Sequence, residues 1–145
     1  MMTADYQIIC DKCRAINRVP QKRLYDKPKC GKCRKLLFDG GLLELSDGNF
    51  QRLLSVGNQP MLVMFWAPWC GYCQKTLPAF RQAVAELEPE LRMATLNTEV
   101  NKFSASRMII NSLPTFVLFK HGQEVARRQG AIHFEQIVAW ANGII

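Results

Sequence analysis

The residues of this chain best suited to chemistry are six cysteines, which fall into three C-x-x-C pairs with none left over. In a reducing compartment such pairs are typical of metal ligands or redox centres rather than of structural disulfides. The pairs are Cys10 with Cys13, Cys30 with Cys33, and Cys70 with Cys73. Each pair can therefore be interpreted as half of a metal site or as a redox centre.

The first two pairs have the C-x2-C-x16-C-x2-C spacing expected of a four-cysteine zinc site. Each C-x-x-C turn can direct two sulfurs to one point, and two turns complete the tetrahedron that zinc prefers. The alternative is a pair of disulfides. About 35 residues with few large apolar side chains need a staple to fold. Zinc is favoured over disulfides as this staple because no export signal is expected. We expect one structural zinc per chain, held by Cys10, Cys13, Cys30 and Cys33.

The third pair favours thiol-disulfide exchange. Cys70 lies at the start of a predicted helix, where unpaired backbone N–H groups and the helix dipole favour a thiolate. Cys73, one turn further along, can attack a mixed disulfide formed by Cys70. The alternative is a further zinc half-site, but it lacks partners, since no other cysteine remains and the only histidines are His121 and His133. We predict that Cys70 attacks and Cys73 resolves.

The elements around Cys70 alternate between strand and helix patterns. The apolar run Met61–Trp66 predicts a strand buried on both faces, and residues 71–88 have helical spacing with Pro78 inside. These patterns predict an α/β fold with a mixed sheet flanked by helices. A predicted hairpin near the end of the chain supplies the antiparallel edge of that sheet. Further elements are expected at 50–54 (helix), 91–96 (strand), 101–108 (helix), 115–119 and 124–127 (a hairpin), and 133–140 (helix).

Length and charge predict two units. A chain of 145 residues holds one full domain and a small module. The formal charge of +7 is confined to residues 1–35, which carry ten Lys and Arg against three Asp, whereas the rest of the chain has nine of each sign. We expect a zinc-ribbon module over residues 1–38 and a larger domain over residues 39–145.

The basic module has two interpretations. Zinc bound to four thiolates would carry a charge of −2 and leave the module at about +5. A solvated surface, or a docking face for acidic proteins, is favoured. Nucleic-acid binding is disfavoured because no aromatic-rich surface or recognition helix is evident.

The sequence favours a cytoplasmic protein. Its longest apolar run, 61–69, has about half of the ~20 residues that a membrane-spanning helix needs. The first residues lack a basic region followed by an apolar stretch, so no secretory signal is expected.

Several motifs together resemble the thioredoxin family, over about residues 41–145. With the two zinc knuckles in front, the whole chain resembles the zinc-ribbon thioredoxins of the bacterial thioredoxin-2 type. The resemblance implies a thioredoxin fold, reduction or isomerisation of protein disulfides, and electrons from an NADPH-dependent thioredoxin reductase. It implies that Pro114 is a cis-proline facing the active site. The other residues expected to support the active site are Trp69, Gly71, Tyr72 and Leu113. Trp69, which is adjacent to Cys70, is expected to shield the thiols. The motifs are Phe65 to Cys73 (FWAPWCGYC), Pro78, Leu113-Pro114-Thr115 and Gly130-Ala131.

Three positions depart from the family pattern. Tyr72 replaces the usual proline between the cysteines, as in isomerase-type members, while Met64 and Thr95 replace a buried aspartate and its lysine partner. The usual general base is therefore missing. A second hypothesis follows, in which the chain is a binding or scaffold protein with slow redox activity.

Overall fold

The computed structural model describes residues 5–145, and its larger part is a five-stranded mixed sheet. The central strand β4 (Met61–Trp66) runs parallel to β5 (Arg92–Asn97) and antiparallel to β6 (Thr115–Lys120). At the two edges lie β3 (Leu43–Leu45), parallel to β5, and β7 (Gln123–Gln129), antiparallel to β6. The mixed sheet predicted from the sequence is confirmed.

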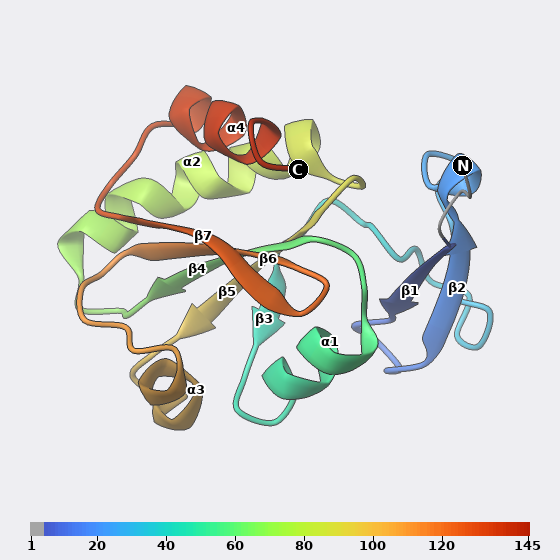
Figure 1. Ribbon diagram of the computed structural model, residues 1–145, viewed down its shortest axis with the longest axis horizontal. Coiled ribbons are helices and arrows are strands. Elements are labelled where there is room, and N and C mark those ends of the chain that lie inside the picture. Colours follow the sequence, from blue (N-terminus) through green and yellow to red (C-terminus); the bar gives the residue numbers. More distant parts are fainter. Residues whose placement is uncertain (1–4) are drawn as a thin grey trace.

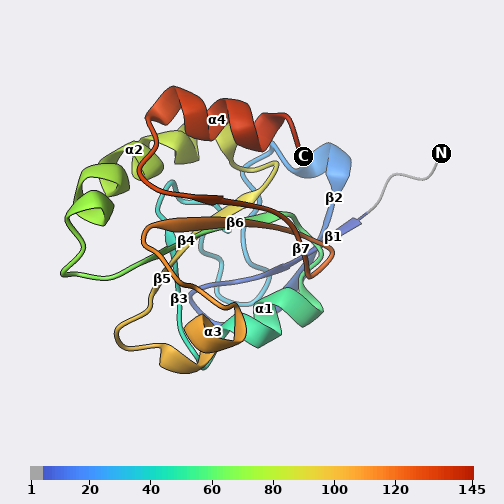
Figure 2. The ribbon, with the colours of Figure 1, turned by 60° about the vertical axis from the view of Figure 1, so that its left-hand side comes forward.

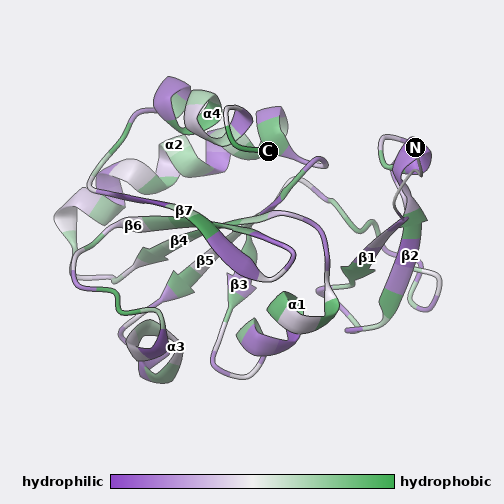
Figure 3. Cartoon of the chain, viewed as in Figure 1, coloured by the Kyte–Doolittle hydropathy of each residue, from purple (hydrophilic) through white to green (hydrophobic). Residues whose placement is uncertain are grey.

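Helices cover both faces of this sheet (Figures 1 and 2). The helices α2 (Gly71–Leu87) and α4 (Phe134–Asn142) lie on one face, and the short helices α1 (Phe50–Val56) and α3 (Lys102–Arg107) lie on the other. Each face has its own buried apolar cluster. The apolar colouring of β4 and β6 in Figure 3 agrees with strands that are covered on both faces.

Alternation along β4 divides its side chains between the two clusters. Leu62 and Met64 pack with α2, whereas Val63 and Phe65 pack on the α1 side. The helix α2 continues through Pro78, in agreement with the prediction that this residue does not end it.

The N-terminal unit, residues 5–38 and called the ribbon below, is a small separate layer. Its strands β1 (Asp5–Ile9) and β2 (Ile16–Pro20) form an antiparallel pair, followed by the 3-10 helix η1 (Gln21–Arg23). The cysteines complete a core that has few large side chains, namely Ile8, Val19, Leu24 and Leu37. Sequence patterns did not predict β1 and β2, because five-residue segments with mixed burial lack a clear period.

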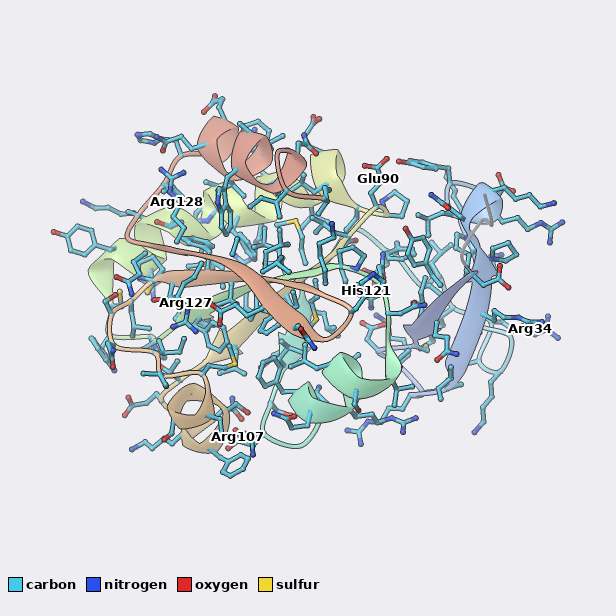
Figure 4. All side chains as sticks on the ribbon, viewed as in Figure 1. Arg34, Glu90, Arg107, His121, Arg127 and Arg128 are labelled. Atoms are coloured by element: carbon cyan, nitrogen blue, oxygen red, sulfur yellow. The ribbon has the colours of Figure 1, made fainter. Side chains whose placement is uncertain are left out.

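The ribbon packs against the end of the sheet opposite to the start of α2 (Figure 1). Arg92 bridges the two units: its guanidinium donates to the carbonyl of Leu37 at 2.9 Å and lies 5.2 Å from the ring centroid of Phe38. The hydroxyl of Tyr25 donates to Glu90, which lies where the units meet (Figure 4). The two units therefore form a specific polar and aromatic interface.

Candidate active site and metal centre

The loop after β4 positions the third cysteine pair. Cys70 is the N-cap of α2, with φ −85° and ψ 112°, and its side chain takes the place of the usual capping oxygen. The backbone N–H of Cys73 donates to the Sγ of Cys70 at 3.2 Å. An N–H group aimed at this sulfur stabilises negative charge on it.

Cys73 lies deeper than Cys70. Its side chain is fully buried, whereas Cys70 retains an exposed fraction of 6% at the surface. Burial, together with the hydrogen bond to Cys70, raises the pKa of the Cys73 thiol to about 12. The two thiols therefore differ in burial and in hydrogen bonding.

Three segments meet at this edge of the sheet. The carboxyl ends of the parallel strands β4 and β5 meet the amino end of β6, which runs the other way. A groove of about 440 Å³ lies between the segments. It is lined by Trp69, Cys70, Gly71, Tyr72, Thr98, Ile110, Asn111, Ser112 and Leu113.

The structure brings most of the predicted support residues together. Trp69, Gly71, Tyr72 and Leu113 line the groove with Cys70, and the Leu113–Pro114 peptide bond is cis, as the family resemblance implied. Pro114 itself is buried, and its carbonyl accepts a hydrogen bond from the N–H of Gly130 at 2.9 Å. All five residues therefore belong to the same edge of the fold.

Trp69 does not cover the groove as a closed lid. Its side chain is 70% exposed, and its indole N–H donates to a carboxylate oxygen of Glu99 at 3.0 Å. Tyr72 is 66% exposed. The groove thus has an open aromatic rim, suited to contact with another macromolecule.

Sequence reasoning missed several groove residues, namely Thr98, Ile110, Asn111 and Ser112. They lie in loops, where no periodicity marks them. Thr98 is held by two hydrogen bonds to the carbonyl of Trp66, from its backbone N–H and from its hydroxyl. The only available signal was their position just after β5 or just before Leu113.

The replaced pair of the family pattern lies directly beneath this site. Met64 and Thr95 are neighbours across β4 and β5, and Met64 is fully buried in the cluster that contains Cys73. Among residues 5–145, no Asp or Glu is buried. The apolar surroundings account for the high pKa of Cys73.

The other four cysteines converge in the ribbon. Their sulfurs all lie within 4.8 Å of one another, with 3.7 Å between Cys10 and Cys33 and 3.5 Å between Cys13 and Cys30. A zinc tetrahedron with Zn–S bonds of ~2.3 Å has edges of about 3.8 Å, so the spacing fits this ion. Closed four-sulfur sites of this kind are structural rather than catalytic.

Hydrogen bonds prepare two of these sulfurs, those of Cys10 and Cys30, for a cation. The backbone N–H groups of Lys12 and Lys32 each point at the sulfur two residues earlier, at 3.4 Å. The N–H of Cys33 and the Asn17 amide lower the pKa of the Cys30 thiol to about 6. Such bonds around metal-binding sulfurs stabilise the thiolate form that zinc requires.

Comparisons with known proteins agree with this geometry. A family profile described as "Thioredoxin" matches residues 41–143, and one described as "Thioredoxin 2, N-terminal" matches residues 9–35. The chain belongs to the thioredoxin family. Its larger part has the thioredoxin fold, preceded by a zinc ribbon.

Individual relatives show the same similarity in sequence. Thioredoxin C-3 of Corynebacterium nephridii is 37% identical over 133 residues, which is 92% of this chain and 91% of the relative. The thioredoxin of Haemophilus influenzae is 30% identical over 70% of this chain and 94% of its own length. A protein disulfide-isomerase A6 homologue of Caenorhabditis elegans is 35% identical over 70% of this chain but only 24% of its own length.

Membership in this family gives the general activity. A thioredoxin is a thiol-disulfide oxidoreductase, acts by dithiol-disulfide exchange, and works with disulfide-bearing proteins and a reductase-type partner. Within residues 5–145, no helix is long and apolar enough to span a bilayer.

Proposed function

We propose that this thioredoxin reduces protein disulfides with Cys70 as the attacking thiol and Cys73 as the resolving thiol. The observation that carries the assignment is the N–H group of Cys73 on the Cys70 sulfur, combined with complete burial of Cys73. The first favours negative charge on Cys70, and the second keeps Cys73 out of reach of a substrate.

The reaction proceeds in two exchanges. The Cys70 thiolate attacks one sulfur of a substrate disulfide, which forms a mixed disulfide and releases the first substrate sulfur as a thiolate. Cys73 then loses its proton and attacks the Cys70 sulfur. This step forms the Cys70–Cys73 disulfide and releases the second substrate sulfur, so two electrons have passed to the substrate.

The groove residues have supporting roles in this proposal. Trp69 and Tyr72 supply the aromatic rim on which a substrate segment rests. Gly71 leaves the approach to Cys70 free, since a Cβ built there would meet no atom within 4 Å beyond its chain neighbours and its own helix. Leu113 and Pro114 place a backbone segment beside Cys70, where an extended substrate can pair with it.

The proposed electron donor is an NADPH-dependent thioredoxin reductase, and the proposed compartment is the cytoplasm. A reducing compartment is compatible with six free thiols or thiolates and with a zinc site made only of cysteines.

The proposed division of the chain is a zinc-ribbon module over 1–38 and a thioredoxin domain over 39–145. Within this division one zinc, held by Cys10, Cys13, Cys30 and Cys33, stabilises the ribbon and takes no part in the exchange. Residues 1–4 of the proposed module lie outside the described part of the chain.

Reductase-coupled turnover of a disulfide protein tests the residue assignment. The wild type is expected to turn over and Cys70→Ser to be inactive, whereas Cys73→Ser should accumulate the mixed disulfide, visible as a mass increase that dithiothreitol removes. Accumulation of the mixed disulfide in Cys70→Ser, and not in Cys73→Ser, would reverse the assignment. Absence of turnover in the wild type would leave the scaffold hypothesis, which the missing buried acid favours.

The reduction potential of the Cys70/Cys73 pair separates reductase from isomerase. A value near about −270 mV fits a reductase, and one near about −180 mV fits an isomerase. Tyr72 between the cysteines and Met64 beneath them both favour a value less negative than that of a typical thioredoxin.

A further inference from the structure

The ribbon carries a second groove that the redox reaction does not use. It has a volume of about 470 Å³ and lies between β2 and the segment after η1. Its lining residues are Asn17, Arg18, Val19, Pro20, Arg23, Asp26, Lys27, Pro28 and Lys29.

This groove follows the free edge of β2, the edge to which no strand within residues 5–145 is paired. Four consecutive residues of β2, 17–20, line it, although neighbours in a strand point to opposite faces. A groove can contact all four only if it runs along the edge. No residue of β1 lines it, so this is the edge of β2 remote from β1.

Hydrogen bonding shows which backbone groups face outward there. Gln7 of β1 is paired with Arg18 of β2, yet the N–H of Gln7 donates away from β2, to the Asn58 side chain at 2.8 Å. In an antiparallel ladder, both members of such a non-hydrogen-bonded pair point their N–H and C=O groups away from each other. The N–H and C=O of Arg18 therefore point outward along the free edge.

The side chains around this edge are basic. Arg18, Arg23, Lys27 and Lys29 are exposed, against one acidic lining residue, Asp26. Among residues 5–145, no carboxylate lies within ion-pair distance of Arg23, Lys27 or Lys29. The one ion pair of Arg18, with Asp5 at 3.6 Å, joins two well-exposed side chains and is weak.

We infer that this groove binds an extended acidic peptide segment of a partner protein, which adds a strand to the free edge of β2. Backbone pairing provides the register, and alternate acidic side chains face the Arg and Lys side chains of the walls. A nucleic acid fits less well, because the outward C=O of Arg18 would face phosphate oxygens. Tyr25, the exposed aromatic residue nearest in sequence, is outside the groove lining and bonded to Glu90, so it offers no stacking platform.

The position of the groove leaves the redox site accessible. Residues of β1 lie beside the first residue of β4, Met61, whereas Cys70 follows the last residue of the same strand. A strand of this length spans about 20 Å. The ribbon and the turn into α2 lie at opposite ends of the molecule in Figure 1, and Figure 4 shows Arg34 projecting from the ribbon end. A partner held by its acidic segment can therefore present a disulfide to Cys70 at raised effective concentration.

A fluorescein-labelled peptide that alternates Glu and Val tests the inference by anisotropy, on the zinc-loaded full-length chain. The double variant Arg23→Glu/Lys27→Glu should bind about tenfold more weakly, since each reversed exposed pair costs up to ~1 kcal/mol. The matched control Arg34→Glu/Lys35→Glu reverses one Arg and one Lys that are exposed in the same module but lie outside the groove lining. It should bind almost as the wild type does.

A peptide of the same sequence, N-methylated at alternate residues, isolates the backbone contribution. It keeps all its charges but loses N–H donors, so it should bind about tenfold more weakly than the unmodified peptide. Zinc content measured for every variant separates loss of binding from loss of the fold.

Three results would overturn the inference. Equal weakening in the groove and control variants would mean general charge attraction only. Unchanged affinity of the N-methylated peptide would exclude strand addition. Displacement of the peptide by single-stranded oligothymidylate at a lower concentration than by unlabelled peptide would assign the groove to nucleic acid.

Discussion

Met64 is the residue that most distinguishes the chemistry of this thioredoxin. It is fully buried among apolar side chains and shares a cluster with Cys73. Since no Asp or Glu is buried within residues 5–145, the resolving thiol has no buried carboxylate to serve as its base. Proton removal from Cys73 must then depend on water or on the departing substrate thiolate. We expect resolution of the mixed disulfide to be slow compared with thioredoxins that keep the acid.

Replacement of Met64 by Asp should restore a base. General-base catalysis typically contributes about 10²–10⁴-fold, so stopped-flow decay of the mixed disulfide should accelerate at least about tenfold. The reduction potential should become more negative, because a carboxylate disfavours a thiolate at Cys70. Burial of the polar group should lower the free energy of unfolding by about 1–3 kcal/mol.

Met64→Asn is the matched control, since it is polar and of similar size to Asp but cannot take a proton. It should cost similar stability without accelerating the reaction. Equal acceleration in both variants would mean that loosened packing, and not a base, limits the step.

The pKa of Cys73 makes a separate prediction about pH. Burial and the hydrogen bond with Cys70 together raise this pKa to about 12. The hydrogen bond is lost in the mixed disulfide, but burial, the larger cause, persists and keeps the pKa above its ordinary value. Below the pKa the thiolate fraction grows about tenfold per pH unit. Decay of the mixed disulfide should therefore rise from about pH 6 to about pH 9 without a plateau. A plateau near neutral pH would indicate that Cys73 already has a base.

At the scale of elements, Glu88 joins the end of α2 to the start of β5. Its carboxylate accepts the N–H of Met93 at 3.0 Å. Partial burial raises the pKa of Glu88 to about 7, although the N–H of Met93 and the charge of Arg92 act in the opposite direction. This junction is therefore sensitive to pH in the neutral range.

The sign of this effect follows from proton binding. Between the unfolded pKa of about 4.3 and the folded value, the folded chain holds the proton more tightly, so the contribution of Glu88 to stability falls as pH rises. The variant Glu88→Gln stays neutral. Its free energy of unfolding should increase relative to the wild type between about pH 5 and about pH 8. Urea titrations at several pH values measure this difference, and a difference independent of pH would refute the prediction.

At the scale of the whole molecule, zinc and the ribbon interface are linked. Zinc removal should unfold the ribbon, whose own apolar core is small, while the thioredoxin domain stays folded on its two buried clusters. Arg92, which is only 8% exposed, would lose Leu37 and Phe38 as partners. The domain should then be destabilised by about 1–3 kcal/mol.

Hydrogen exchange of the full chain with and without chelator measures this prediction. Amides of β1 and β2 should lose protection completely. Those of β4 and β6 should lose only the small part of their protection that comes from the interface with the ribbon. Global loss of protection would show that the units fold as one. Restoration by added zinc is the control for damage by the chelator.

The chemistry of this protein was readable from sequence wherever it depends on neighbours along the chain. Spacing within each C-x-x-C pair determines whether two sulfurs can meet, and the apolar run 61–66 is long enough to identify the central strand. Periodicity also located α2 and α4, because a helix repeats its buried face within one segment. The family motifs implied the cis bond before Pro114.

Tertiary structure alone decided what depends on segments far apart in sequence. The three residues of β3 are too short to show a period, and they are a strand because Ala94 to Leu96 of β5 pair with them. Thr98 and residues 110–112 reach Cys70 only because three strand ends share one edge of the sheet. Nothing in the sequence distinguishes Arg92 from other strand arginines, and only the packing of the ribbon gives it the carbonyl of Leu37 as a partner. The groove beside β2 exists because, within residues 5–145, β2 pairs only with β1 and its other edge stays open, an arrangement that no local pattern encodes.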